Sequence, residues 1–332
     1  MIPGRRLDSS SLVPIAILVV LVAFPWFGGR FYIDLMLTMM ILAIFALSLE
    51  LLVGTTGLVS FGHAAFFGIT AYAVALLSPA ARAPSLFWLL PAAVGAAAAY
   101  AIFVGALSLR TRGIYFIMVT LAFAQMAYYV FHDTPLGRGT DGIYLNVKPV
   151  VAVGDHTLLD LSRPLAFYYF TLACLVATFG LLGLVTHSNF GRALAGIRAN
   201  EQRMRAAGFS TYPYKLAAFV VAGALAGLAG FLYAVKDGFV NPEILAWHQS
   251  GVVLLMVILG GIGSLRGAVL GAFAFTLLKE AAQSEALFGA FAKHWQLTLG
   301  LAIIACVALM PNGLMGISGE MRRRASARIH AR

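Results

Sequence analysis

Charged residues are scarce in this chain, where Asp, Glu, Lys and Arg make up 11% of 332 residues. Soluble globular domains carry about 25%, so this composition excludes a soluble fold. Hydrophobic residues make up 61% of the chain, and its mean hydropathy is +0.89. We therefore predict an all-α polytopic membrane protein, because a helix satisfies its backbone hydrogen bonds within its own segment in lipid.

Cysteine and the common catalytic signatures are also lacking. Cys174 and Cys306 both lie inside apolar blocks, so the sequence offers no disulfide framework and no metal-ligand spacing. It contains no G-x-x-x-x-G-K-[ST], no H-E-x-x-H and no G-x-S-x-G. The chain therefore cannot bind ATP through a P-loop, and neither an enzyme nor a cofactor is predicted.

Long apolar runs dominate what is present. A run of roughly 17–25 apolar residues can cross a bilayer as a helix. The sequence predicts eight to ten such spans, and we expect about ten. The third and eighth are the weakest of the apolar blocks at 12–29, 31–53, 62–78, 85–109, 114–131, 165–186, 216–235, 248–262, 267–283 and 294–311.

The distribution of charge predicts the topology. Lys and Arg concentrate in loops that stay in the cytoplasm, and an even number of spans places most basic residues of this chain on that side. We expect cytoplasmic tails at 1–11 and 315–332, flanking a single transmembrane domain at 12–314. The net charge of +10 is then explained by topology and anionic lipid, and no nucleic acid partner is predicted.

The strongest basic interval is the loop at 187–215, which we expect to be cytoplasmic. Residues 192–207 are predicted to form a helix, with Gly208 as its C-terminal stop and a favourable i,i+4 pair between Glu201 and Arg205. Such a helix could lie on the membrane, dock into a partner's groove, or be a solvated positive loop. Its only acid is Glu201, and its basic residues are Arg192, Arg198, Arg203, Arg205 and Lys215.

Three further features bear on the organisation. The segment at 132–163, rich in Gly and Asp, is predicted to form an external hairpin or cap. The segments at 57–61 and 261–265 resemble each other, which indicates either an internal repeat or two ordinary turns. Small residues spaced for close helix packing recur in three apolar blocks, at Ala93, Ala97, Ala101 and Gly105, at Gly223 and Gly227, and at Gly267 and Gly271.

Few ionisable residues lie inside the apolar blocks, and each is expected to face protein or water. Glu50 could meet the ammonium group of a zwitterionic solute, or could bond a neighbouring helix. His63 could line a path, or could only cap a helix. Coupling to protons usually needs a denser relay than these residues with Glu280 provide, so a proton-coupled secondary transporter is the weaker alternative.

Three stretches together resemble the membrane-spanning permeases of branched-chain amino acid ABC importers. They are GLVSFGHAAFFGITAYAVALL at 57–77, IRANEQRMRAAGFSTYPYKLAAFVVAGALAGLAGFLYA at 197–234 and LMVILGGIGSLRGAVLGA at 255–272. With GTDGI in the external segment, the similarity extends from about Met36 onward. The chain looks most like the longer of the two permease types in these importers.

The resemblance implies a multi-pass subunit of the cell inner membrane. A second permease, two ATP-binding ATPase subunits and a periplasmic solute-binding protein would be its partners, and an amino acid its solute. The loop at 187–215 would then contact the ATPase, through Arg192, Arg198, Glu201, Arg205 and Gly208. The candidates for the path are Glu50, Ser60, His63 and Ser264.

Two departures from the family pattern put the solute in doubt. Glu50 stands where relatives often carry Asn or Asp, and Thr55 where an aromatic residue is common. Related permeases carry urea, short amides or other amino acids, so these solutes remain alternatives to branched-chain amino acids.

Overall fold

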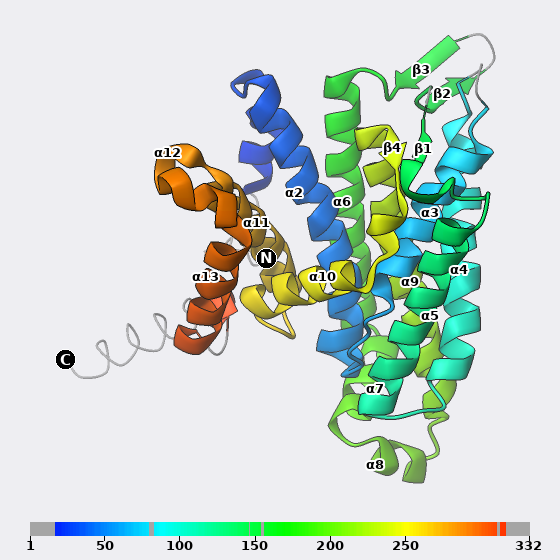
Figure 1. The fold of residues 1–332 in the computed structure, drawn as a ribbon. Helices are drawn as coiled ribbons and strands as arrows, with labels where there is room; N and C mark the ends of the chain where they lie inside the picture. The colour runs from blue at the N-terminus through cyan, green and yellow to red at the C-terminus, as the bar shows by residue number, and fades with distance from the viewer. Residues whose placement is uncertain (1–16, 80–82, 146, 154–155, 311–312, 317–332) are drawn as a thin grey trace, which may run out of the picture.

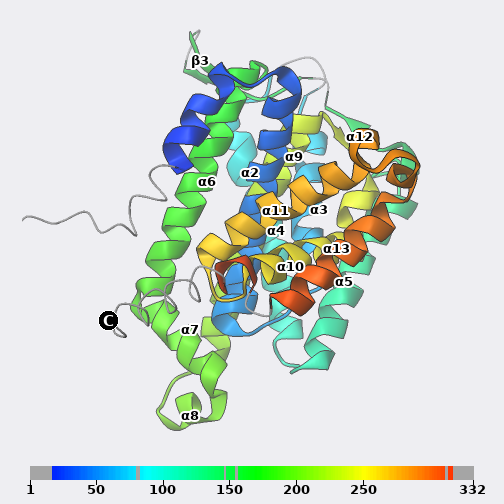
Figure 2. The same ribbon diagram turned by 90° about the vertical axis from the view of Figure 1, so that its left-hand side faces the viewer.

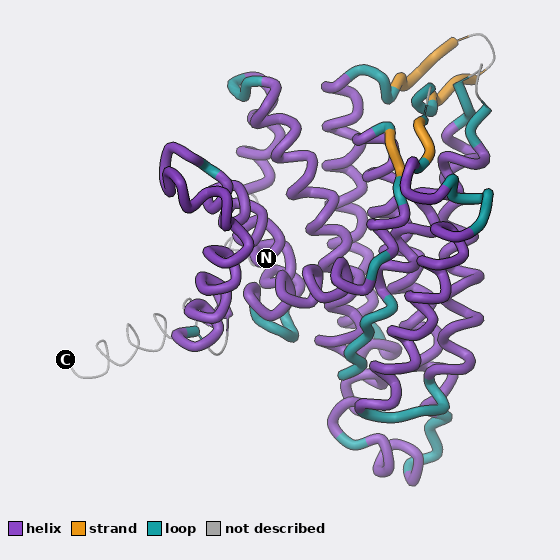
Figure 3. Tube along the Cα trace, viewed as in Figure 1, coloured by secondary structure: helices purple, strands orange, loops and turns teal. Residues whose placement is uncertain are grey.

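The computed structural model describes residues 17–79, 83–145, 147–153, 156–310 and 313–316. The predicted tail at 1–11 and nearly all of that at 315–332 lie outside these ranges. The described part is mainly helical (Figures 1 and 3). Its main helices are α2 (Arg30–Glu50), α3 (His63–Leu77), α4 (Leu86–Ser108), α5 (Ile114–Asp133), α6 (Pro164–His187), α7 (Asn189–Ala199), α8 (Glu201–Ala206), α9 (Thr211–Asp237), α10 (Trp247–Gly260), α11 (Leu265–Gln283), α12 (Glu285–Phe288) and α13 (Trp295–Leu309).

Every predicted apolar block coincides with a helix, but these helices differ in length. Six of the helices among the described residues are long and apolar enough to cross a membrane: α2, α4, α5, α6, α9 and the helix containing α13. The pair α10 and α11 would make a seventh span, although it bends by 116°. The first and third blocks form the shorter apolar helices Ile17–Trp26 and α3. The coarse architecture is therefore that of a multi-pass helical bundle.

Helix α9 lies at the centre of the bundle and packs against α2, α3 and α4. Within their most apolar windows, α2 and α9 are 83% and 72% buried, whereas α5 is only 22% buried. A helix that is apolar on all sides and buried belongs to the core, and one that leaves apolar residues exposed faces lipid or a partner. Helix α5 is of the second kind.

The predicted small-residue faces meet at the contact between α4 and α9. A Cβ added to Gly223 would lie 2.6 Å from the Ala101 Cβ, and one added to Gly227 would lie 2.9 Å from the Ala97 Cβ. Both alanines are fully buried. Close approach of backbones is what drives helix association in lipid, so the prediction that these residues serve packing is confirmed.

Helices α10 and α11 fold back on each other beside α2. Gly267 and Gly271 of α11 lie directly against the backbone of Gly260 in α10, and a Cβ on Gly271 would lie 2.7 Å from the Gly260 nitrogen. Figure 1 shows α10 lying across the bundle about midway between its ends, with α11 turning away from it. Hydropathy reports where apolar segments lie but not the angle between them, so the two apolar blocks alone could not predict this bend.

Two groups of short elements mark the opposite ends of the bundle (Figures 1 and 2). At one end, β2 (Val150–Val153) pairs antiparallel with β3 (His156–Asp160), so the segment at 132–163 does contain a hairpin. Nearby, β1 (Ile143–Tyr144) pairs with β4 (Phe239–Val240). The other end carries α7 and α8, so the two segments predicted to lie on opposite sides of the membrane occupy opposite ends of the fold.

Candidate functional site

The loop at 187–215 forms two helices, so the prediction of one continuous helix over 192–207 was wrong. The break falls at Asn200, whose backbone is extended (φ −161°, ψ 99°) and whose side-chain oxygen accepts a hydrogen bond from the Arg203 amide at 2.9 Å. Asparagine competes with a helix by bonding nearby backbone and therefore favours N-cap positions. Asn200 ends α7 and begins α8.

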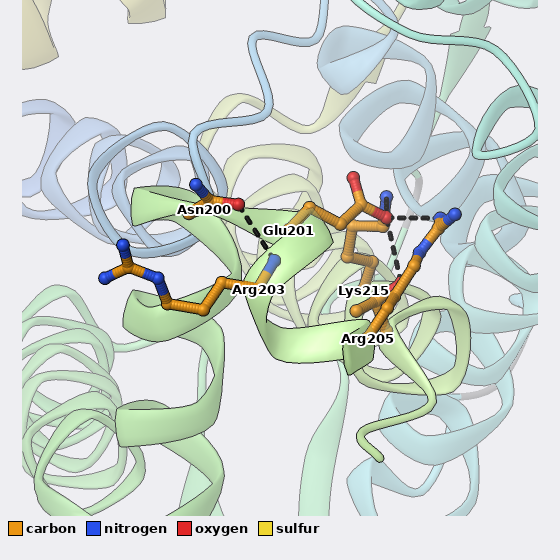
Figure 4. A network of polar contacts seen from close by, with 6 residues as sticks. Asn200, Glu201, Arg203, Arg205 and Lys215 are labelled. Atoms are coloured by element: carbon orange, nitrogen blue, oxygen red, sulfur yellow. Dashed lines mark hydrogen bonds and ion pairs between the residues drawn. The ribbon is translucent and has the colours of Figure 1, made fainter. Parts of the chain in front are cut away.

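Glu201 joins α8 to the start of α9 (Figure 4). Its Oε1 accepts hydrogen bonds from the Arg205 Nη2 at 2.6 Å, the Thr211 hydroxyl at 2.8 Å and the Lys215 Nζ at 2.9 Å. The predicted i,i+4 pair between Glu201 and Arg205 is therefore present. Lys215 gives the network a buried anchor, because its side chain is only 8% exposed.

These partners also shift the acid's titration. Partial burial opposes ionisation of Glu201, but the hydrogen bonds from Lys215 and Thr211, the Lys215 charge and the Arg205 hydrogen bond outweigh it. Together they lower the pKa of Glu201 from 4.5 to about 2. The carboxylate is thus ionised at any physiological pH and holds α8 in place.

Gly208 ends α8, as predicted. It adopts a left-handed conformation (φ +86°), and the Phe209 amide donates to the Met204 carbonyl at 3.0 Å while the Gly208 amide donates to the Arg205 carbonyl at 2.9 Å. This pair of bonds is the Schellman arrangement, which favours glycine because other residues are strained there. Around it lies an exposed surface made by Gln202, Arg203, Ala206, Ala207, Gly208 and Phe209.

Helix α7 is attached to the membrane bundle. Its inner face is apolar, with Leu194 and Ile197 buried. Arg198 extends from this helix to the carbonyl of Gly54, which it hydrogen-bonds, and Gly54 belongs to the π-helical turn Leu51–Thr56 that ends α2. Arg198 therefore links α7 to the end of α2.

A second bond continues from that turn to the bend between α10 and α11. The Oε1 of Glu50, the last residue of α2, accepts a hydrogen bond from the Gly263 amide at 2.6 Å. The Glu50 side chain folds over Gly54, where a Cβ would collide with its carboxylate. Glu50 is 2% exposed, and Arg198 lies within electrostatic reach. One candidate for ATPase contact and one for the solute path thus belong to a single connected structure.

Two further candidates lie at helix starts. Arg192 bonds the His187 carbonyl at the end of α6, at 3.2 Å, and the Asn189 side chain at the start of α7, so it is separate from this connection. Ser264 caps α11 by accepting from the Gly267 amide at 3.2 Å, and its backbone also hydrogen-bonds Glu50. Ser264 therefore belongs to the same bend as Gly263.

Ser60 and His63 are fully buried inside the bundle. The Ser60 hydroxyl accepts from the Gly62 amide at 3.2 Å, and the His63 Nε2 lies 2.8 Å from the Ser48 hydroxyl. The His63 ring also stacks on Phe45. These contacts explain the two residues as interior packing, and a role in the path stays a prediction.

The sequence analysis did not identify the contacts of several residues of the site. Thr211 and Lys215 could have been found as polar residues within reach of Glu201 across a short turn. Gly54 and Gly263 could not, because their partners Arg198 and Glu50 lie 144 and 213 positions away. Among the described residues, no group of three His, Cys, Asp or Glu side chains is placed to hold a metal ion.

Comparison with known proteins adds the family. Residues 31–308 match the family described as branched-chain amino acid transport system / permease component. The chain is 31% identical over 321 residues to the high-affinity branched-chain amino acid transport system permease protein LivM of Escherichia coli K12, covering 91% of this chain and 74% of that protein.

More distant relatives are also permeases. LivH of Escherichia coli K12, from the same type of system, is 24% identical over 82% of this chain and 91% of its own length. The autoinducer 2 import system permease LsrC of Yersinia pseudotuberculosis is 30% identical over 42% of this chain and 43% of its own. Among solved structures, PsaBC from Streptococcus pneumoniae in complex with Fab is similar with a TM-score of 0.46 at 13% identity, covering 88% of this chain and 95% of that chain.

Proposed function

Because this chain belongs to the branched-chain amino acid transport permease family and is a permease subunit of an ABC importer, we propose that its loop at 187–215 couples it to a separate ATPase. The observation that carries this proposal is the contact of Arg198 with the Gly54 carbonyl, which ties the loop to the end of α2. The exposed surface around Gly208 is free for a partner to dock against.

The solute we propose is a branched-chain amino acid. The support comes from LivM and LivH, whose names give this class of solute, and from their coverage of most of this chain. LsrC is named as part of an autoinducer 2 import system, so a solute other than a branched-chain amino acid, such as urea, a short amide or another amino acid, is the alternative. Competition binding with the importer's solute-binding protein would decide between them.

The proposed assembly has four further parts. Similarity to both LivM and LivH supports a second permease of a different type as the partner. Two ATPase subunits would dock on the α7–α8 end, and a periplasmic solute-binding protein on the end that carries β1–β4. This arrangement would put the α7–α8 end and both termini in the cytoplasm of a cell with an inner membrane, which requires an even number of spans within the expected eight to ten.

The proposed mechanism is alternating access driven from the cytoplasm. ATP binding would move the docked α8, and the Glu201 network would carry α7 and α9 with it. Arg198 would then pull on the turn Leu51–Thr56, and Glu50 would pass the movement to the bend at Gly263. Such coupling works only if the ATPase contacts differ between the two states of the permease.

Reconstitution of the whole importer in proteoliposomes tests the proposal. Uptake of leucine should require ATP and the ATPase subunits and should continue after a protonophore collapses the proton gradient. Loss of uptake with the protonophore would instead identify a proton-coupled secondary transporter.

Gly208→Asp should abolish uptake and ATPase binding while membrane insertion continues, and normal uptake by this variant would remove the loop from the mechanism.

A further inference from the structure

Two ionisable side chains are exposed where the chain crosses the middle of the bundle. Glu243 lies in the 3₁₀ turn Pro242–Leu245, and His248 lies in the first turn of α10. Both are solvent-exposed in the isolated chain, and neither has a side-chain hydrogen bond or an ion pair with a described residue. Trp247, between them, is 48% exposed.

Contacts with α3 and α5 fix the depth of these residues. The Phe61 amide, just before α3, donates to the Thr120 hydroxyl at 3.3 Å, about a third of the way along α5. The Ala64 amide donates to the Ser250 hydroxyl of α10 at 2.9 Å. The turn Pro242–Leu245 packs against both α3 and α5. The segment that carries Glu243 and His248 therefore lies beside α5, and Figure 1 shows the helix that follows, α10, about midway between the ends of the bundle.

An exposed carboxylate at this depth is costly in hydrocarbon, and such a group faces either protein or a water-filled cavity. Polar side chains continue from Glu243 toward the end of the bundle that carries the β-strands. Glu243 interacts electrostatically with Tyr128, whose ring stacks on His132 at 5.3 Å between centroids. The His132 Nδ1 in turn lies 2.6 Å from the Asp133 Oδ1, at the last residue of α5.

This series forms a polar stripe, defined by Asp133, His132, Tyr128, Glu243 and His248, that descends from one end of α5 to its centre. A stripe of this kind offers hydrogen-bonding groups to water and to a polar solute along half the thickness of the bundle. A lipid-facing surface would not have it, as the rest of exposed α5 illustrates with Met118, Met126 and Val130.

We propose that the stripe lines the solute path and that Glu243 accepts a hydrogen bond from the solute's ammonium group midway through the membrane. The inference rests on the proposed function, and it deepens that function by assigning a contact that selects amine-bearing solutes. It also moves the path from the buried interior at Ser60 and His63 to the exposed face formed by α5 and α10. At that face the second permease would enclose the other side of the solute path.

Cysteine accessibility in the complete importer tests the position of the stripe. With Cys174 and Cys306 replaced by Ser, Glu243→Cys and His248→Cys should react with a membrane-impermeant cationic methanethiosulfonate reagent. Leucine, presented with the binding protein, should slow the reaction. The control is Leu301→Cys on α13, which is 60% exposed in the isolated chain and should not react because it faces lipid or protein. Absence of reaction at both stripe positions, or reaction that leucine does not slow, would overturn the proposal.

Uptake tests the chemistry of the contact. Glu243→Gln keeps the size of the side chain and removes its charge, so leucine uptake should fall by about tenfold or more. Glu285→Gln on α12, also exposed, is the matched control and should be neutral. Uptake at the wild-type level by Glu243→Gln would contradict the proposed contact between Glu243 and the solute, but not the proposed ABC importer function. If uptake by the wild-type complex did not depend on ATP, the proposed function would be contradicted. The labelling would still report whether water reaches the stripe.

Discussion

A single carboxylate, Glu201, ties α8 to the start of α9, because it bonds Arg205 in α8 and Lys215 in α9. Lys215 is nearly buried, and Glu201 is its ion-pair partner among the described residues. A buried cation left without its anion is strongly unfavourable. At the residue scale, therefore, the order of the loop depends on the ionisation of Glu201.

That dependence gives a pH prediction. The folded pKa of Glu201, about 2, lies below its ordinary value of 4.5. The stabilisation is therefore complete above pH 4.5 and is lost as the pH falls toward 2. Amide hydrogen exchange at 201–209, corrected for its intrinsic rate, should be constant from about pH 7 to 5 and rise below this window.

Glu201→Gln supplies the control for this measurement. The variant should show faster exchange at neutral pH, because a neutral amide at position 201 no longer forms ion pairs with Lys215 and Arg205. Its exchange rate should also depend much less on pH below 5. If the wild-type loop loosened between pH 7 and 6, a group other than Glu201 would be responsible.

Arg198 and Glu50 make a second prediction at this scale. Arg198→Ala removes the contact with Gly54, and Glu50→Gln weakens the contact with Gly263. Each should reduce uptake by about tenfold, since hydrogen bonds to charged groups contribute about 1.5–3 kcal/mol. ATPase binding should persist, because neither side chain belongs to the surface around Gly208.

A double-mutant cycle distinguishes one connected path from two independent ones. If the bonds act in series, the double variant should lose little more activity than either single variant. Additive losses would contradict the proposed connection from α7 to the bend. Arg112→Ala serves as the comparison, because the exposed Arg112 side chain, in the turn between α4 and α5, has no hydrogen bond or ion pair with a described residue and leaves both bonds intact.

Among the elements, α8 is the shortest helix of the loop, and its end depends on one backbone conformation. No atom lies within 4 Å of a Cβ built on Gly208, so space does not select glycine there. The φ of +86° does, because a left-handed conformation costs an ordinary residue about 1–2 kcal/mol. Gly208→Val should therefore destabilise the loop and reduce uptake.

Gly208→Asn separates conformation from surface shape. Asparagine tolerates the left-handed region, so this variant should keep most of the uptake and ATPase binding that Val loses. Both properties can be measured on the purified complex. Equal loss in the two variants would show that the ATPase needs the bare glycine surface, and would contradict a role limited to ending α8.

The elements also show how far the sequence could predict the fold. Each apolar block became a helix because apolar length decides whether a segment crosses a bilayer. The break at Asn200 was missed because its side chain could cap a new helix or only interrupt an apolar face. The bend between α10 and α11 depends on glycines approaching a particular backbone, which no local pattern reports. The hydrogen bonds from Arg198 to Gly54 and from Gly263 to Glu50 could not be predicted for the same reason, since they join segments that meet only after folding.

At the scale of the whole molecule, the bundle has two unlike ends and an incompletely covered side. The ends carry the strands and the α7–α8 loop (Figure 2). The side formed by α5 exposes the polar stripe together with large apolar residues, whereas α2 and α9 are enclosed. This distribution agrees with a permease whose exposed side at α5 is covered by a partner permease.

The orientation of the bundle yields the last prediction, which the coupling scheme requires. With Cys174 and Cys306 replaced, Ala206→Cys at the exposed end of α8 should react with an impermeant maleimide only after the cells are permeabilised. Thr140→Cys, exposed in the segment at 132–163, should react once the outer barrier alone is removed. The reason is that basic loops are retained in the cytoplasm, and five basic residues lie in the loop that contains Ala206 against one acid. Reaction of Ala206→Cys from outside an intact inner membrane would place α8 beyond the reach of any ATPase, and coupling through Arg198 would then be untenable.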